Sequence, residues 1–258
     1  MLTEVKGLII RTTDIRESDR MLTIYTEEQG IISALARGAR SIKSRLMSTT
    51  TQFCYASFVL YGQGDKLWVK EAALIDNFYD IRSSIEGLAL AGYIAEVLCH
   101  VATAEGDRDL IRLSLNSLYA ISRRTHPLNR IKAVFEMRLA SILGFMPDVL
   151  RCRVCGTGEG EFYFDIMAGA IECYHCHNES AGSSPIIDES EERYVLTLLT
   201  EGAKVALGYA IYAPMDKLFS FNLSDEDMRY MSRAAEEYLL NHLGRGFKTL
   251  DFYKEVSV

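Results

Sequence analysis

The fold is decided by five short runs of sequence: VKGLIIRT (residues 5–12), MLTIYT (21–26), IISALAR (31–37), FCYASFVLY (53–61) and LWVKEAALI (67–75). All five are rich in β-branched and aromatic residues, which favour β-strands. Turn residues separate them, including Gly30 and the segment Gly62–Asp65. Five short strands in succession predict a small β-barrel of the OB-fold type. Composition alone does not distinguish it from an SH3-like barrel.

The pattern changes from strands to helices after Asp76. Apolar residues recur at helical spacing in residues 88–102, in 110–121 and, after Pro127, in 128–142. A further helix is predicted between the N-cap Ser224 and Gly244, and we expect it to pack back onto the others. Small residues at 181–185 predict a flexible connection before that helix.

Four cysteines form the most specific motif of the chain. They stand in two C-x-x-C pairs: Cys152 with Cys155, and Cys173 with Cys176. The seventeen residues between the pairs fit the spacing of a four-cysteine zinc site, and residues 162–166 and 170–172 can form the hairpin that joins the two pairs. Because four protein ligands close the coordination shell, we expect one structural Zn²⁺ ion. Reduced buried thiols or a redox dithiol are the alternatives. His175 and His177 are interpreted as bystanders.

These patterns together predict an α+β multidomain protein. An N-terminal OB-fold β-barrel for nucleic-acid binding is expected over residues 1–80, and a C-terminal α-helical domain over residues 81–149 and 180–258. The four-cysteine zinc module, residues 150–179, is inserted into the helical domain.

Several functional classes lack their sequence signals. The chain contains no P-loop, no H-E-x-x-H motif and no deaminase motif, so we expect that it is not an enzyme. A nuclease is the enzymatic rival, but the acidic residues Asp14, Glu17 and Asp19 are interleaved with arginines, which favours surface ion pairs. No apolar run is long enough to span a membrane and no signal peptide is recognised, so a cytoplasmic location is expected.

Cations are concentrated in one N-terminal segment, although the net charge of the chain is −7. No acidic residue occurs between Glu28 and Asp65. That interval contains Arg37, Arg40, Lys43 and Arg45. Four cations among small residues are typical of a loop that binds phosphates, and the alternative is an ordinary solvated loop.

A second group of cations spans two predicted helices. It comprises Arg123, Arg124, Arg130 and Lys132, together with Arg138, and is opposed nearby only by Glu136. The group is interpreted as a second DNA-binding surface, as a docking site for an acidic peptide or as a solvated face.

Aromatic residues lie in the predicted strands beside the first cationic segment. Strand alternation places Phe53, Tyr55 and Tyr61 on one face and Phe58 on the other. One set is expected in the core, whereas the other can stack on bases.

Three parts of the sequence resemble the bacterial RecO family of recombination and repair proteins. The resemblance rests on TDIRESDRML (13–22) with ARGAR (36–40), on FEMRL (135–139) through LGFMP (143–147) to Cys152, and on GAIEC (169–173) with LNHLG (240–244). It covers essentially the whole chain in the expected order.

The resemblance implies a non-catalytic mediator of DNA repair. Such a protein binds single- and double-stranded DNA, pairs with RecR and contacts the C-terminal tail of the single-strand-binding protein. It promotes strand annealing and indirectly serves RecA by helping to load it, in association with the nucleoid. A zinc-ribbon interaction scaffold without direct DNA contact is the alternative.

Overall fold

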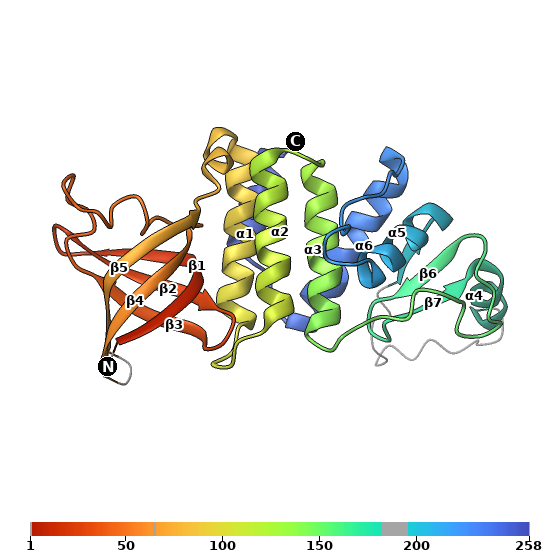
Figure 1. Ribbon diagram of the computed structural model, residues 1–258. Helices are drawn as coiled ribbons and strands as arrows, with labels where there is room; N and C mark the ends of the chain where they lie inside the picture. The colour runs from red at the N-terminus through yellow and green to blue at the C-terminus, as the bar shows by residue number, and fades with distance from the viewer. Residues whose placement is uncertain (1, 64–65, 182–195, 258) are drawn as a thin grey trace. The chain divides into compact units, whose positions relative to one another are not determined.

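The computed structural model describes residues 2–63, 66–181 and 196–257. Most of the predicted flexible connection at 181–185 lies outside these residues. The chain divides into two compact units, one from residues 1–125 with 247–258 and the other from residues 126–246. Figure 1 labels their elements. The domain bounds predicted above stay a prediction.

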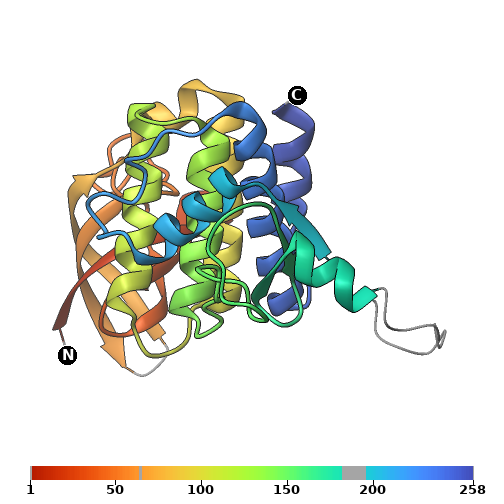
Figure 2. The ribbon, with the colours of Figure 1, turned by 90° about the vertical axis from the view of Figure 1, so that its right-hand side faces the viewer.

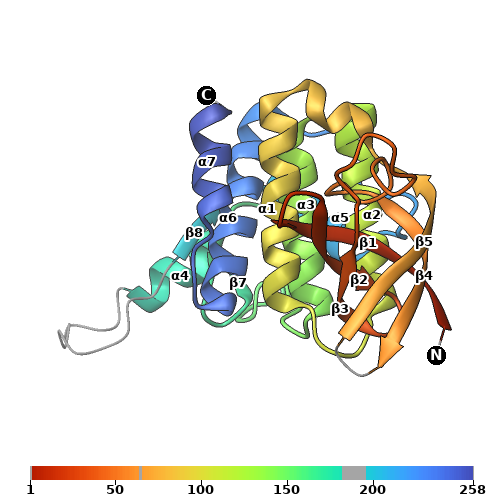
Figure 3. The same cartoon turned by 90° about the vertical axis from the view of Figure 1, so that its left-hand side faces the viewer.

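The barrel of the first unit is built from five strands. They are β1 (Leu2–Ile15), β2 (Asp19–Thr26), β3 (Gly30–Ala36), β4 (Tyr55–Gln63) and β5 (Lys66–Asp76). The barrel is closed in the order β1-β2-β3-β5-β4, with β3 and β5 parallel (Figure 3). The strand β1 pairs with β2 along one edge, where the register shifts between Ile9 and Arg11, and with β4 along the other. The predicted OB-like barrel is confirmed.

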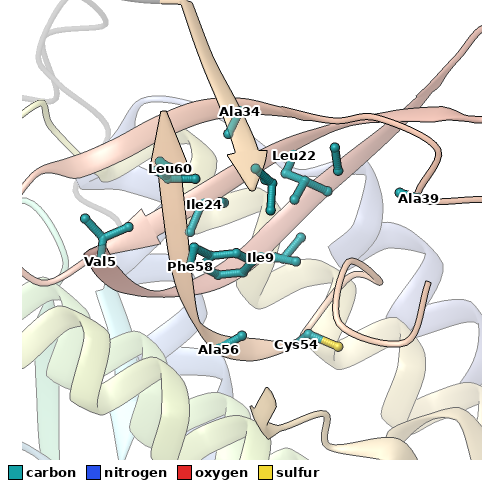
Figure 4. Packing of buried hydrophobic residues seen from close by; sticks show 12 residues of the cluster. Val5, Ile9, Leu22, Ile24, Ala34, Ala39, Cys54, Ala56, Phe58 and Leu60 are labelled. Atoms are coloured by element: carbon teal, nitrogen blue, oxygen red, sulfur yellow. The ribbon is translucent and has the colours of Figure 1, made fainter. Parts of the chain in front are cut away.

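Small and large side chains complement each other inside the barrel. Phe58 is fully buried, and the alanines at positions 34, 36 and 56 belong to the same core cluster (Figure 4). Gly7 has to lack a side chain, because a Cβ there would lie 2.3 Å from a methyl group of Ile24. This close packing keeps apolar residues inside and leaves alternate strand residues for the outer face.

Helices complete the first unit. The 3₁₀ helix η1 (Tyr79–Ser83) precedes α1 (Ile85–Val101), α2 (Arg108–Arg123) and α7 (Lys248–Val256). The helices α1 and α7 pack together, and Thr249 donates from its backbone to the carboxylate of Glu96 at 3.1 Å (Figure 3). Sequence periodicity predicted α1 and α2 but missed α7.

The second unit combines helices with a small sheet. It contains α3 (Leu128–Ile142), β6 (Phe162–Asp165), β7 (Ala170–Cys173), α4 (Tyr174–Ala181), β8 (Leu196–Leu199), α5 (Glu201–Tyr212) and α6 (Asp225–Leu243). The strand order is β7-β6-β8, and α4 follows β7 directly (Figure 2). The helix α6 packs on α3 and ends at Gly244, as predicted. Pro127 is the N-cap of α3, which begins at Leu128.

None of the helices in the described ranges has the length and apolar character needed to cross a bilayer.

Candidate metal centre and nucleic-acid interface

The four cysteines of the two C-x-x-C pairs meet in the second unit. Cys152 and Cys155 precede β6, Cys173 ends β7, and Cys176 lies in the first turn of α4. Their Sγ atoms all lie within 4.8 Å of one another, and those of Cys155 and Cys173 are 3.7 Å apart. Sulfurs around a tetrahedral ion with bonds of about 2.3 Å are separated by roughly 3.8 Å. This cluster, which we call the cysteine cage, can therefore hold a metal ion.

Hydrogen bonds shift the pKa values of two cysteines in the cysteine cage. The Sγ atom of Cys152 accepts hydrogen bonds from the backbone N–H groups of Val154 at 3.4 Å and Cys173 at 3.3 Å. Desolvation raises the pKa of Cys152, but these and neighbouring donors outweigh it and lower the pKa to about 6. Hydrogen bonds with the thiols of Cys155 and Cys173 raise the pKa of Cys176. A thiolate is the ligand form of cysteine, so Cys152 is already suited to bind.

Other side chains brace the cysteine cage without entering it. Arg153 forms ion pairs with Asp165 at 3.1 Å and with Glu172 at 2.6 Å. His177 packs on Tyr163, with ring centroids 4.3 Å apart, and His175 is exposed. In the part of the chain that the structure describes, the four cysteines are the only group placed to bind a metal.

The cations of the first unit lie on one loop. The basic loop, residues 37–54, connects β3 to β4 and carries exposed Arg37, Arg40, Lys43 and Arg45. Its base is fixed to the turn between β1 and β2, because Asp19 accepts from the backbone of Gly38 at 2.8 Å and Ser18 accepts from that of Arg40 at 3.0 Å. Gly38 has a φ of 63°, a left-handed conformation that favours glycine.

Arg40 holds the basic loop in place. Its Nε lies 3.2 Å from Oδ2 of Asp14, and its Nη1 donates to the carbonyls of Arg16 and Glu17, each at 3.2 Å. Asp14 also pairs with Arg20 at 3.0 Å. The prediction that Asp14 takes part in surface ion pairs is confirmed.

The remaining cations of the basic loop are exposed and can bind an external anion. Among the described residues, Arg37, Lys43 and Arg45 form no ion pair, and all three are exposed. Ile42, beside Lys43, is 92% exposed. The exposure of Ile42 was not predicted. Its only signal in the sequence is one large apolar residue among cations and serines.

An aromatic pair lies on the outer face of the barrel. Tyr61 and Trp68 are cross-strand partners on β4 and β5, and their rings stack with centroids 5.6 Å apart and planes inclined by 23°. The guanidinium carbon of Arg37 lies 5.6 Å from the centroid of the Trp68 ring. Phe53 does not share this face, because it precedes β4, has a φ of 70° and is buried. Phe58 is in the core, on the opposite face from Tyr61 as predicted.

The second group of cations is divided between the two units. Arg123 and Arg124 end α2 in the first unit, whereas Arg130 and Lys132 lie on α3 in the second. Arg124 donates to Ser83 at 2.8 Å. Arg130 lies over the ring of Phe221 at 5.1 Å.

Lys132 requires a correction, because it was predicted to contact DNA. Its side chain is 3% exposed and its ammonium lies 3.0 Å from Glu136 and 2.7 Å from Glu236. Burial lowers the pKa of Lys132, but the two carboxylates outweigh it and the pKa is raised. The sequence offered only Glu136 as a counter-ion, since Glu236 lies far along the chain on α6. Arg138 likewise donates to the carbonyls of Ile211 and Ala213 within the protein.

Comparison with known proteins finds matches to both the N-terminal and the C-terminal part of the chain. A family model described as the N-terminal part of recombination protein O matches residues 1–78, and one described as its C-terminal part matches residues 82–251. The DNA repair protein RecO of Acetivibrio thermocellus is 33% identical, with 98% of this chain and 97% of that protein covered. The RecO proteins of Listeria monocytogenes serotype 4b and Caldanaerobacter subterraneus are 28% and 25% identical over 99% and 98% of this chain, and 95% and 98% of their own lengths are covered. With matches that run through the barrel, the helices and the cysteine cage, this chain belongs to the RecO family of DNA repair proteins.

Proposed function

We propose that this protein is a non-enzymatic mediator of recombinational repair that binds single- and double-stranded DNA. In this role it pairs with RecR, engages DNA coated by the single-strand-binding protein, promotes annealing of complementary strands and helps to load RecA. The basic loop is the observation that carries the proposal. It presents Arg37, Lys43 and Arg45 without internal counter-ions in the described part of the chain, on an OB-like barrel of a RecO family member.

Binding to DNA through the basic loop follows from electrostatics. Each cation that neutralises a phosphate releases a condensed counter-ion, so the affinity rises at low salt and falls as salt is added. Arg40 contributes differently, since its charge is already paired with Asp14 and its role is to position the loop. We therefore assign the phosphate contacts to Arg37, Lys43 and Arg45.

The cations at the end of α2 are proposed to serve a second contact. Arg123 and Arg124 are exposed and lie side by side in the sequence. They either extend the path of the DNA or receive the acidic C-terminal tail of the single-strand-binding protein. Reversing both charges to Glu separates these roles: loss of tail-peptide binding alone assigns the pair to the tail, and loss of DNA binding alone assigns it to the DNA.

The metal of the cysteine cage is proposed to be one structural Zn²⁺ ion. Four thiolates form a closed tetrahedral set, which is typical of structural zinc and leaves no position for water or substrate. Elemental analysis of the purified protein tests this proposal, and one zinc per chain is expected. A folded protein without stoichiometric zinc would contradict it.

An annealing assay tests the proposed function most broadly. Two complementary fluorescent strands are coated with single-strand-binding protein, and the wild type is compared with the Arg37→Ala, Lys43→Ala, Arg45→Ala triple variant. The wild type is expected to speed annealing at least several-fold, and the variant is expected to lose this effect. Equal annealing with and without the wild type would favour the alternative of a scaffold that reaches DNA only through partners.

A further inference from the structure

The strand β5 presents an alternating pattern of cations and an aromatic residue on the outside of the barrel. Lys66, Trp68 and Lys70 alternate with Leu67 and Val69, which pack in or against the barrel core. Lys66 and Lys70 are exposed and Trp68 is partly exposed, so the three side chains lie on the outer face. A large aromatic ring between two cations on a barrel surface points to a ligand that is both flat and anionic.

The neighbouring strand widens the aromatic surface. Tyr61 on β4 stacks on Trp68, and 37% of Tyr61 is exposed. From the end of β3, Arg37 reaches over the Trp68 ring. Among the residues that the structure describes, these three cations form one ion pair, that of Lys70 with Glu71 at 3.9 Å. Two cations, Lys66 and Lys70, therefore lie on either side of Trp68 along β5. A third, Arg37, lies over its ring.

We propose that Tyr61 and Trp68 form a stacking platform for an unpaired nucleotide base, with Arg37, Lys66 and Lys70 binding the phosphates on either side of it. This inference rests on the proposed function and assigns the platform to single strands. A base adds its π-face to the existing stack of two rings, and Arg37 pairs with the adjoining phosphate. Bases within a duplex are already stacked on their neighbours, so duplex DNA gains nothing from the platform and binds through cations only.

The stacking contact changes affinity by a predictable amount. Removing one aromatic ring that stacks on a base weakens single-strand binding about tenfold, and the effect tolerates any base because every base has a π-face. The platform therefore predicts a preference for single strands over duplexes without a preference for sequence.

Trp68 is the only tryptophan of the chain, so the intrinsic fluorescence of the protein reports on the platform directly. The experiment titrates the wild type with an oligo-dT strand and with a duplex of equal length, and follows tryptophan fluorescence. A labelled copy of each DNA reports total binding by anisotropy under the same conditions. We expect the single strand to quench the fluorescence with the same midpoint as the anisotropy change, and the duplex to bind without quenching.

Three variants test the contribution of the rings. Trp68→Leu and Tyr61→Leu are expected to weaken single-strand binding about tenfold and to leave duplex binding unchanged. The matched control is Tyr212→Leu on α5, which removes another exposed tyrosine from an element to which no DNA contact is assigned. This variant is expected to bind both DNAs like the wild type.

The outcomes separate the platform from the proposed function. Single-strand binding by anisotropy without a change in wild-type tryptophan fluorescence, together with unchanged affinity of Tyr61→Leu, would overturn the platform and leave the DNA-binding function standing. Absence of any anisotropy change with either DNA at low salt would overturn both. The fluorescence arm uses the wild type, so it does not depend on how well a variant folds.

Discussion

The Nε atom of Arg40 lies 3.2 Å from Oδ2 of Asp14, and this ion pair joins the basic loop to the end of β1. The same guanidinium donates to the backbone carbonyls of Arg16 and Glu17. Arg40, which the sequence predicts to contact phosphate, therefore also anchors the loop. Removing an anchoring cation and removing a phosphate-contacting cation of this loop should therefore have different effects on loop mobility and on DNA binding.

Arg40→Ala is expected to loosen the basic loop without removing a phosphate contact. Trypsin should then cleave after Lys43 and Arg45 faster than in the wild type, because the loop loses the hydrogen bonds of the Arg40 side chain to the preceding turn. The dependence of log affinity on log salt should keep its slope, since the Arg40 charge is already paired. Lys43→Ala is the matched control, with an unchanged loop and a shallower slope by about 0.7 for single strands. A slope lowered equally by both variants would contradict the assignment.

Lys132→Met is expected to destabilise the protein by about 3–5 kcal/mol, because it removes the ammonium that pairs with the fully buried carboxylate of Glu136. Urea denaturation followed by circular dichroism measures this loss. Lys217→Met, an exposed lysine in the same unit, should change the stability little. Replacing Lys132, Glu136 and Glu236 together by apolar residues should recover much of the loss. A neutral Lys132→Met variant would contradict the buried ion-pair assignment.

The raised pKa of Lys132 predicts how the stability of the protein changes at high pH. The pKa of Lys132 is raised above its ordinary value of 10.5, so its contribution to stability is fully present below that value and is lost as the pH rises through the folded pKa. The stability difference between wild type and Lys132→Met should therefore stay constant at neutral and mildly alkaline pH. It should shrink only above about pH 10. A difference that already shrinks near neutral pH would contradict this sign.

The metal content of the protein is expected to depend on pH and on the four cysteines of the cysteine cage. The folded pKa of Cys152 is about 6 against an ordinary value of 9.0, so its thiolate favours folding at high pH and this contribution is lost as the pH falls through 6. Protons then compete with the metal for the sulfurs. Metal retained after dialysis should be stoichiometric at neutral pH and decline as the pH becomes acidic, as measured by elemental analysis. Cys173→Ser should lose the metal at neutral pH, whereas Cys99→Ser, outside the cysteine cage, should retain it.

Local sequence patterns were sufficient wherever one face of an element is buried or one motif sets the geometry. Richness in β-branched and aromatic residues predicted the five strands, which turn one side chain in two toward the core around Phe58. The two C-x-x-C pairs predicted the cysteine cage because each pair alone brings two sulfurs together.

Elements with weak local signals were missed. The helix α5 contains Gly202 and Gly208, which lower its helical propensity, and β8 is only four residues long. The helix α7 follows two glycines and begins in a cationic segment, so its helical pattern is weak, yet Leu250 and Tyr253 are buried. Such elements depend on tertiary packing more than on local preference.

Contacts distant in sequence explain the errors at the candidate interface. The pairing of Lys132 with Glu236 joins two helices, and no pattern within α3 announces it. The anchoring of Arg40 by Asp14 is of the same kind, since the two residues lie on different sides of β2 and β3 in the sequence. A sequence shows which cations are present, whereas the fold decides which of them remain available.

Salt-dependent binding to a labelled single strand tests the central claim most directly. Anisotropy titrations at several salt concentrations compare the wild type with the Arg37→Ala, Lys43→Ala, Arg45→Ala variant, and circular dichroism verifies that both are folded. We predict that the variant binds more weakly at low salt and that the magnitude of its log affinity against log salt slope is smaller by about 2, as three lost phosphate contacts require. Equal affinity and equal slope for the two proteins would contradict the assignment of DNA binding to the basic loop.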